Sequence, residues 1–178
     1  MYSPLMVYNR GRMNPKDFER RMAEANCLLK FAMVIYKLQL SSGRNLLHEH
    51  PKTAKSWKNR SVRKLLKDPK VYTVDADLCM FGLLARGVDR KLVVARTTTR
   101  FMSSAPAILE RLGMKCQGGH VHQHLVDGRA KAAAIYPPML CRAMIQGAHE
   151  QMQREGGGGA PRNILNKLDV GCAIFNFG

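Results

Sequence analysis

Alternating strand and helix signals in residues 45–74 constrain the fold of this 178-residue chain more than any other feature. Asn45–His48 predicts a short buried strand, and Pro51 predicts its end, because proline cannot donate a hydrogen bond to a sheet. A helix is expected near Asn59–Lys67 and a second strand at Val71–Val74. A strand, a helix and a strand in succession are typical of a parallel sheet with covering helices, so the expected class is α/β.

The most clearly marked helix is expected over about Pro15–Leu40. Asn14 is a good N-cap residue, and proline is favoured in the first helical turn. Apolar residues recur there at helical spacing, so most of one side is expected to be covered by the rest of the domain. These residues are Phe18, Met22, Leu28, Leu29, Met33, Ile35, Tyr36 and Leu38.

The middle of the chain is expected to complete a mixed sheet. Lys91–Ala95 and Arg100–Ser103 are predicted strands, and they could form a hairpin with each other. A helix is predicted over Ser104–Leu112, with Ser104 as its N-cap ahead of Pro106.

Residues 127–154 are expected to be helical, with a break at Tyr136-Pro137-Pro138. One buried stripe is predicted from residues that stand four apart on the last helix: Leu140, Met144, Ala148 and Met152. A chain of this length with 46% hydrophobic residues can bury one sizeable core, so residues 1–154 are expected to form one domain. Residues 155–160 form a predicted glycine-rich linker, and residues 161–178 a tail that adds a small helix and an edge strand or stays poorly ordered.

The net charge favours a polyanionic partner. The formal charge is +16, from 29 Lys and Arg residues against 13 Asp and Glu residues. This imbalance causes self-repulsion in the free chain and attracts nucleic acid, either DNA or RNA. An acidic protein, an anionic membrane surface or ribosomal RNA in a larger assembly could satisfy the same charge.

The strongest predicted binding feature is a cationic run in which Asp68 is the only acid. Its cations are Lys52, Lys55, Lys58, Arg60, Arg63, Lys64, Lys67 and Lys70. Helical spacing puts the four cations from Arg60 to Lys67 on one face, where they could neutralise phosphates. Trp57 could stack on a base or cover the sheet edge. A merely solvated charged surface is the alternative.

Two further groups of cations extend this predicted interface. The first is Arg86, Arg90, Lys91, Arg96 and Arg100 around the strand pair, and the second is Arg129 and Lys131 near the start of a helix. Of these, Arg100, Arg129 and Lys131 are expected to contact nucleic acid. Both groups could instead satisfy helix ends and surface carboxylates.

Cysteine usage points to a reducing compartment. The five cysteines are odd in number and show no C-x-x-C spacing: Cys27, Cys79, Cys116, Cys141 and Cys172. Free thiols are expected, and with them an intracellular protein, nuclear or cytoplasmic. No apolar stretch is long enough to cross a bilayer and no leader pattern begins the chain, so no membrane association is expected.

Cys116, His120, His122 and His124 gather sulfur and imidazole ligands within one short loop. His-x-His in an extended segment places both rings on one side, and a bend at Gly118-Gly119 could bring the cysteine toward them. Zinc uses such ligands, but this spacing matches no standard zinc module. The prediction is a polar or phosphate-contacting loop without metal, and zinc is the alternative.

Several short motifs occur in the order found in one enzyme family. They are Ser3-Pro4 with Met6, Leu46-Leu47-His48-Glu49-His50-Pro51, Val71–Gly82, Thr99–Ser104 and His122–Cys141. Together they resemble the back half of DNA cytosine methyltransferases of the retroelement-associated type, relatives of which are known from dinoflagellate genomes.

The resemblance implies a truncated three-layer, Rossmann-type mixed sheet with covering helices that lacks the N-terminal cofactor half. Glu49 corresponds to the acid that helps protonate the target cytosine, and a solvated loop acid is the alternative for it. Met6 occupies the position of the nucleophilic cysteine, and a thioether cannot form the covalent bond to the ring. No G-x-G-x-x-G turn is present, so no cofactor is expected; S-adenosylmethionine would bind only if an upstream half were supplied.

The expected function is sequence-nonspecific nucleic-acid binding by a catalytically disabled, retroelement-derived methyltransferase-like domain, which is not an enzyme as this chain stands. One alternative is the catalytic-side fragment of a split or longer DNA cytosine methyltransferase that uses S-adenosylmethionine. Another is a basic structural or adaptor subunit that packs on acidic protein or ribosomal RNA in a larger complex.

Overall fold

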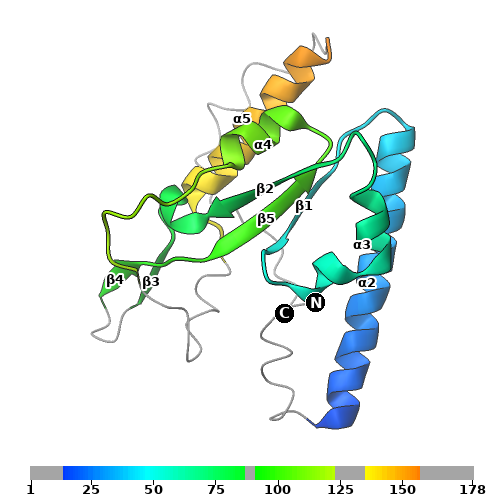
Figure 1. Cartoon of the computed structure of the whole chain (residues 1–178), viewed down its shortest axis with the longest axis horizontal. Coiled ribbons are helices and arrows are strands. Elements are labelled where there is room, and N and C mark those ends of the chain that lie inside the picture. The colour runs from blue at the N-terminus through cyan, green and yellow to red at the C-terminus, as the bar shows by residue number, and fades with distance from the viewer. Residues whose placement is uncertain (1–13, 87–90, 123–134, 157–178) are drawn as a thin grey trace. The chain divides into compact units, whose positions relative to one another are not determined.

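The computed structural model describes residues 14–86, 91–122 and 135–156, which form a mixed α/β chain (Figure 1). Its elements, in order, are α2 (Pro15–Ser41), β1 (Leu47–Pro51), η2 (Lys55–Lys58), α3 (Arg60–Leu65), β2 (Tyr72–Asp77), η3 (Leu78–Phe81), β3 (Leu84–Arg86), β4 (Leu92–Val94), β5 (Thr98–Ser103), α4 (Pro106–Leu112) and α5 (Pro138–Arg154). Two compact units divide them. The described part of the first unit is residues 14–73 and 100–105, and the remaining described residues form the second unit.

The larger sheet has the strand order β1-β5-β2, so the two strands of the predicted strand-helix-strand segment do not pair with each other. The Ser103 hydroxyl, at the end of β5, donates to the carbonyl of Leu46 just before β1 (2.5 Å), and the Leu46 N–H donates to the Ser104 hydroxyl (3.2 Å). The end of one strand therefore meets the start of the other, which makes β1 and β5 antiparallel. The strand-helix-strand segment therefore forms no parallel pair of its own, because β5, a strand from later in the chain, lies between β1 and β2.

The predicted hairpin between Lys91–Ala95 and Arg100–Ser103 is also wrong. β4 pairs instead with β3, antiparallel, with Leu84 opposite Val94 and Arg86 opposite Leu92. β3 has only three residues, too few for an alternating pattern to reveal it in the sequence. β4 therefore belongs to a separate two-stranded sheet.

Helix α2 confirms the predicted start and nearly the predicted end. The Asn14 side chain accepts a hydrogen bond from the Lys16 N–H (2.9 Å), with proline in the first turn. Only Ala25, Leu29 and Met33 are buried on it, whereas its other large apolar side chains include four exposed ones, Leu28, Phe31, Val34 and Leu38. The buried face of α2 is therefore narrower than the sequence predicted.

The core of the first unit lies between α2, α3 and the sheet strands. Its buried members are Leu29, Met33, Leu46, Ala54, Trp57, Val62, Leu65, Val71 and Met102. Helix α3 is capped by Asn59, whose side chain accepts from the Ser61 N–H (2.8 Å). The predicted amphipathic character of α3 is confirmed, because Val62 and Leu65 are buried while the cations between them are exposed.

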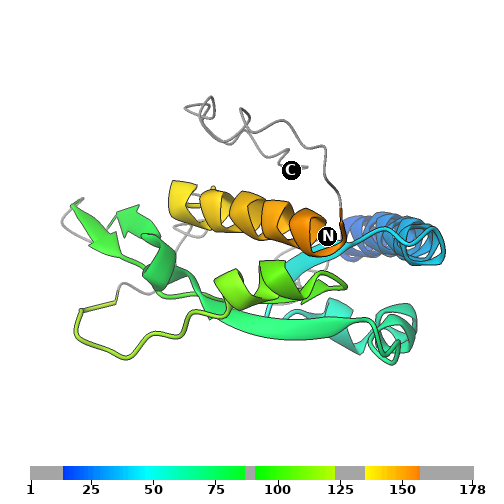
Figure 2. The ribbon, with the colours of Figure 1, turned by 90° about the horizontal axis from the view of Figure 1, so that it is seen from above.

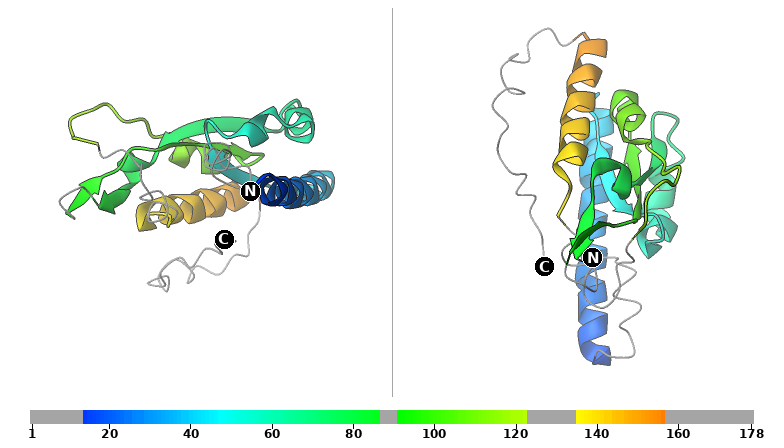
Figure 3. Two further views of the ribbon diagram at one scale, coloured as in Figure 1. Left: turned by 90° about the horizontal axis from the view of Figure 1, so that it is seen from below. Right: turned by 90° about the vertical axis from the view of Figure 1, so that its left-hand side faces the viewer.

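In the second unit, α4 and α5 lie side by side (Figure 2, Figure 3). A Cβ atom on Gly147 would lie 2.6 Å from the Ile108 Cα, so a residue without a side chain allows this close approach. The N-terminus of α4 is capped by Gln151 of α5, whose side-chain oxygen accepts from the Ala107 N–H (3.1 Å). The predicted cap is wrong, since the Ser104 hydroxyl bonds to Asn45 and Leu46 instead.

The predicted stripe on α5 is correct at its start and wrong at its end. The buried residues are Leu140, Cys141, Gly147 and Gln151, whereas Met152 is 46% exposed. Four-residue steps advance about 400° around a helix with 3.6 residues per turn, so a row of such steps drifts off the buried face. Two ion pairs also join the helices at their surface, Arg111 with Glu150 and Arg154 with Glu110.

Candidate nucleic-acid interface

The cations of residues 52–70 form an exposed basic segment in the first unit. Its members are Lys52, Lys55, Lys58, Arg60, Arg63, Lys64, Lys67 and Lys70, all of them exposed. Within the described residues, none of the seven from Lys55 onward forms an ion pair with an acid. Their charge is therefore available to an external anion.

Local structure explains why these cations face outward. Asn59 starts α3, and burial of Val62 (0% exposed) and Leu65 (4% exposed) against the core fixes the rotation of the helix. Arg60, Arg63 and Lys64 then lie on the remaining face, as helical geometry requires.

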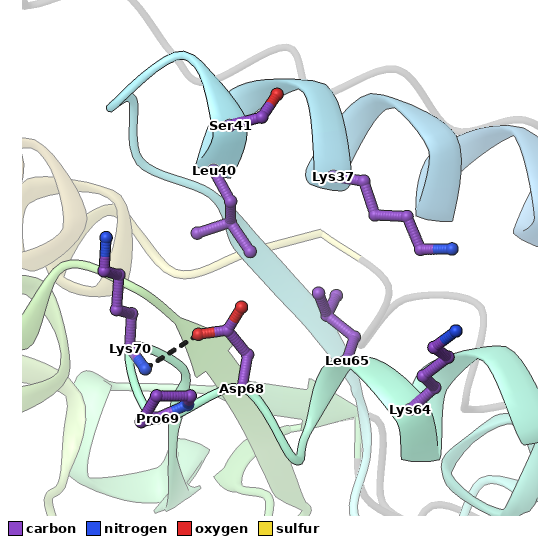
Figure 4. Close-up of a pocket in the computed structure, with 8 residues that line it drawn as sticks. All are labelled: Lys37, Leu40, Ser41, Lys64, Leu65, Asp68, Pro69 and Lys70. Carbon is purple, nitrogen blue, oxygen red and sulfur yellow. Dashed lines mark hydrogen bonds between the residues drawn. The ribbon is translucent and has the colours of Figure 1, made fainter.

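A groove of about 490 Å³ lies beside this segment in the first unit (Figure 4). Its lining comes from the end of α2 and from the end of α3 with the turn that follows: Lys37, Leu40, Ser41, Lys64, Leu65, Asp68, Pro69 and Lys70. Three lysines and a single acid, Asp68, line it, and the Asp68 carboxylate accepts a hydrogen bond from the Lys70 backbone N–H (2.9 Å). The groove is therefore net positive. Sequence reasoning missed Lys37, because only the packing of α2 brings it to Lys64.

Trp57 is buried (8% exposed) and does not project from the basic segment. Its ring N–H donates to the Pro51 carbonyl (3.0 Å), and the Arg100 guanidinium lies over the ring, 5.7 Å from its centroid. Because the ring is buried, the structure favours the prediction that Trp57 covers the sheet edge over the prediction that it stacks on a base. Arg100 is half-buried on β5, where it packs on this ring.

A cluster of rings surrounds Trp57 on the same side of β1. His48 is 6% exposed, and its Nδ1 lies 3.1 Å from the Tyr36 hydroxyl, while its Nε2 has no hydrogen-bond partner among the described residues. Burial, together with the charge of His50, lowers the pKa of His48 to about 4. Burial also lowers the pKa of His50, whose Nδ1 lies 2.7 Å from the Ser56 hydroxyl. Both rings are therefore neutral near pH 7, and His48 is buried in the core whereas His50 is half-buried.

Glu49 lies inside β1 between these two histidines and is partly exposed. The sequence prediction put it just beyond a strand that begins at Asn45, but the observed strand begins at Leu47 and includes Pro51. An edge position in the sheet order tolerates this proline. A strand interior, unlike a loop, offers Glu49 little freedom to reach a substrate.

Two cysteines and two histidines converge in the second unit. The ligand atoms of Cys79, Cys116, His120 and His122 all lie within 4.8 Å of one another. Cys116 Sγ is 3.5 Å from His122 Nε2 and 3.7 Å from His120 Nε2. Burial, reinforced by Cys116, raises the pKa of the Cys79 thiol to about 11. The sequence prediction had three of these residues and missed Cys79, which lies far away along the chain.

Some predicted residues lie outside the described part of the chain. They are Ser3, Pro4, Met6, Arg90, His124, Arg129, Lys131 and Cys172, together with residues 127–134 of the predicted C-terminal helix, residues 157–160 of the predicted linker and the tail at 161–178. Within the described ranges, no helix has the length and hydropathy that a membrane crossing requires.

Comparison of the chain with models of protein families, with curated proteins and with solved structures finds no match. The resemblance to DNA cytosine methyltransferases therefore stays a prediction from the motifs.

Proposed function

We propose that this protein binds nucleic acid without sequence specificity, through the basic segment and the adjoining groove of the first unit. The observation that carries the proposal is the set of seven exposed cations, from Lys55 to Lys70, that no acid of the described residues neutralises. Phosphates are the anions that a nucleic acid presents at regular spacing, and lysine and arginine bind them whatever the sequence.

Several features support binding rather than catalysis. The thiol required of a cytosine methyltransferase is replaced by Met6 in the corresponding motif, and Glu49 is held within a strand. The three-layer methyltransferase-like architecture and the retroelement origin belong to the same proposal and rest on the order of the motifs. Binding would then use an inherited nucleic-acid surface without the methyl-transfer reaction.

The test is fluorescence anisotropy with a labelled DNA duplex, a labelled single strand and an RNA of the same sequence, over a series of salt concentrations. The site variant carries Arg60→Gln, Arg63→Gln and Lys64→Gln. The matched control carries Lys16→Gln, Arg21→Gln and Lys30→Gln, which remove the same charge from exposed positions of α2. Each lost phosphate contact lowers the log-log salt slope by about 0.9, so the site variant is expected to lose about 2.7.

The control variant is expected to keep nearly the whole slope of the parent chain. Equal losses of salt slope in both variants would mean that net charge alone attracts the polyanion. No binding of the parent chain even at low salt would contradict the proposal and favour an acidic protein partner. Repeating the series with S-adenosylmethionine tests the alternative that the chain is a fragment of a methyltransferase. Saturable binding of S-adenosylmethionine would support a methyltransferase fragment instead.

A further inference from the structure

We propose that Cys79, Cys116, His120 and His122 bind one zinc ion, which closes the loop 116–122 onto η3 and stabilises the second unit. All four residues belong to this unit. Two thiolates and two imidazoles form a ligand set that zinc favours in structural sites.

The distances fit tetrahedral coordination. With Zn–S near 2.3 Å and Zn–N near 2.0–2.1 Å, tetrahedral angles put a sulfur and a nitrogen ligand about 3.6 Å apart, and two sulfurs about 3.8 Å apart. Cys116 Sγ lies 3.5 Å and 3.7 Å from the two imidazole nitrogens. The widest separation among the four ligand atoms is no more than 4.8 Å, so about 1 Å of side-chain movement completes the tetrahedron.

The backbone around the ligands suits a bound metal. Gly118 (φ +89°) and Gly119 (φ +83°) turn the chain back after Cys116, in a conformation that residues with side chains rarely adopt. This turn brings His120 to the cysteine and lets the Gly118 N–H point to Cys116 Sγ, 3.4 Å away. Such a hydrogen bond orients the sulfur, as the partners of metal ligands usually do.

Asp77 links the two segments that carry the ligands. Its Oδ2 accepts from the Cys116 N–H (3.0 Å), and its Oδ1 accepts from the Thr98 hydroxyl (2.5 Å). The Asp77 N–H in turn donates to the Met114 carbonyl (2.9 Å). Asp77 ends β2 just before η3, so these bonds hold Cys79 and Cys116 at a fixed separation. We assign Asp77 as a positioning residue.

The arrangement indicates a structural rather than a catalytic ion. Four protein ligands complete the coordination of zinc, whereas catalytic sites usually keep one position for water or substrate. A Cys79–Cys116 disulfide is the competing use of the two thiols, and a polar loop with no ligand is another. The metal stoichiometry, the number of free thiols and the visible spectrum of the bound metal distinguish the zinc site, the disulfide and the loop without a ligand.

The experiment uses the full chain, purified under reducing conditions and stripped with a chelator, and adds Co²⁺ as a spectroscopic probe. The expected result is one Co²⁺ per chain, with the intense visible bands of a tetrahedral ion and a thiolate charge-transfer band, all displaced by one equivalent of Zn²⁺. Cys79→Ser and Cys116→Ser are expected to lose this spectrum. The control Cys27→Ser, an exposed cysteine of the first unit, is expected to keep it.

A variant that is expected to gain signal distinguishes the loss of a metal ligand from a failure to fold. His122→Cys would create a site with three thiolates, so the charge-transfer band is expected to increase relative to the visible bands while the stoichiometry stays at one. An octahedral spectrum in the parent chain, unchanged spectra in both Cys→Ser variants, or a Cys79–Cys116 disulfide that forms in preference to metal binding would overturn the proposal. The readout involves no nucleic acid and is therefore independent of the proposed function.

Discussion

The carboxylate of Asp77 accepts a hydrogen bond from the backbone N–H of Cys116 (3.0 Å), a residue of the loop that carries three of the four proposed zinc ligands. The same carboxylate accepts from the Thr98 hydroxyl. One side chain thus ties the loop to the ends of two strands, so the geometry of the ligands depends on a residue that does not bind metal itself.

Asp77→Asn is expected to weaken Zn²⁺ affinity by about 10–100-fold, the usual effect of losing a residue that orients a ligand. The amide keeps one acceptor oxygen and cannot accept both bonds. The measurement is competition of Zn²⁺ with a chromophoric chelator. Asp75→Asn, which removes the same charge from the same strand, serves as the control, and an equal loss of affinity in both variants would contradict the positioning role.

The stability of the fold is expected to decrease as the pH falls from 6.5 toward 4. His48 has a pKa of about 4 in the folded chain and a usual pKa near 6.5 when unfolded, so in this window the unfolded state binds the extra proton. The contribution of the neutral His48 ring to the free energy of unfolding is fully present above pH 6.5. On the order of 3 kcal/mol of this free energy is lost by pH 4. The titratable groups that face this ring are Tyr36 from α2 and His50 on the same strand, and the Trp57 ring of η2 packs edge-on against it.

Urea unfolding at a series of pH values checks this expectation. His48→Phe keeps an aromatic ring in the core and is expected to reduce the pH dependence, with a remainder from His50, whose pKa is also lowered. His149→Ala on α5 is the control and is expected to keep the dependence of the parent chain. A parent chain equally stable at pH 4.5 and pH 7 would refute the neutral, buried role of His48.

Gly147→Ala is expected to destabilise the second unit by about 1–3 kcal/mol, even though alanine favours a helix by about 1 kcal/mol over glycine. The added Cβ would meet the backbone of α4, 2.6 Å from the Ile108 Cα and 2.9 Å from the Ala107 carbonyl oxygen. Thermal unfolding followed by circular dichroism measures the effect. Gln153→Ala, at an exposed position of the same helix, should leave the midpoint nearly unchanged, and a more stable Gly147→Ala would disprove the close helix contact.

Trp57 is the single tryptophan of the chain, so its fluorescence reports on one site. Because the ring is buried, acrylamide is expected to quench it weakly in the folded chain and strongly in urea. Saturating oligonucleotide is expected to change the emission little, since the phosphates bind to cations and not to this ring. Strong quenching by oligonucleotide would restore the base-stacking role.

The parts of the fold that the sequence predicted well depend on residues close together in the chain. Asn14 caps α2 through the N–H two residues further on, and burial of Val62 and Leu65 places Arg63 and Lys64 outside, as their spacing predicted. Local hydrogen bonds and helical periodicity control such features, so they can be read from the residues alone.

The tertiary structure decided what depends on distant residues. β5 lies between β1 and β2, Gln151 rather than Ser104 caps α4, and Cys79 rather than a neighbour of the loop completes the Cys and His cluster. Each of these contacts joins segments well separated along the chain, and periodicity carries no information about which segments meet. The sequence by itself therefore determined the cationic surface and the local helices, and only packing decided the strand order and the four-residue cluster.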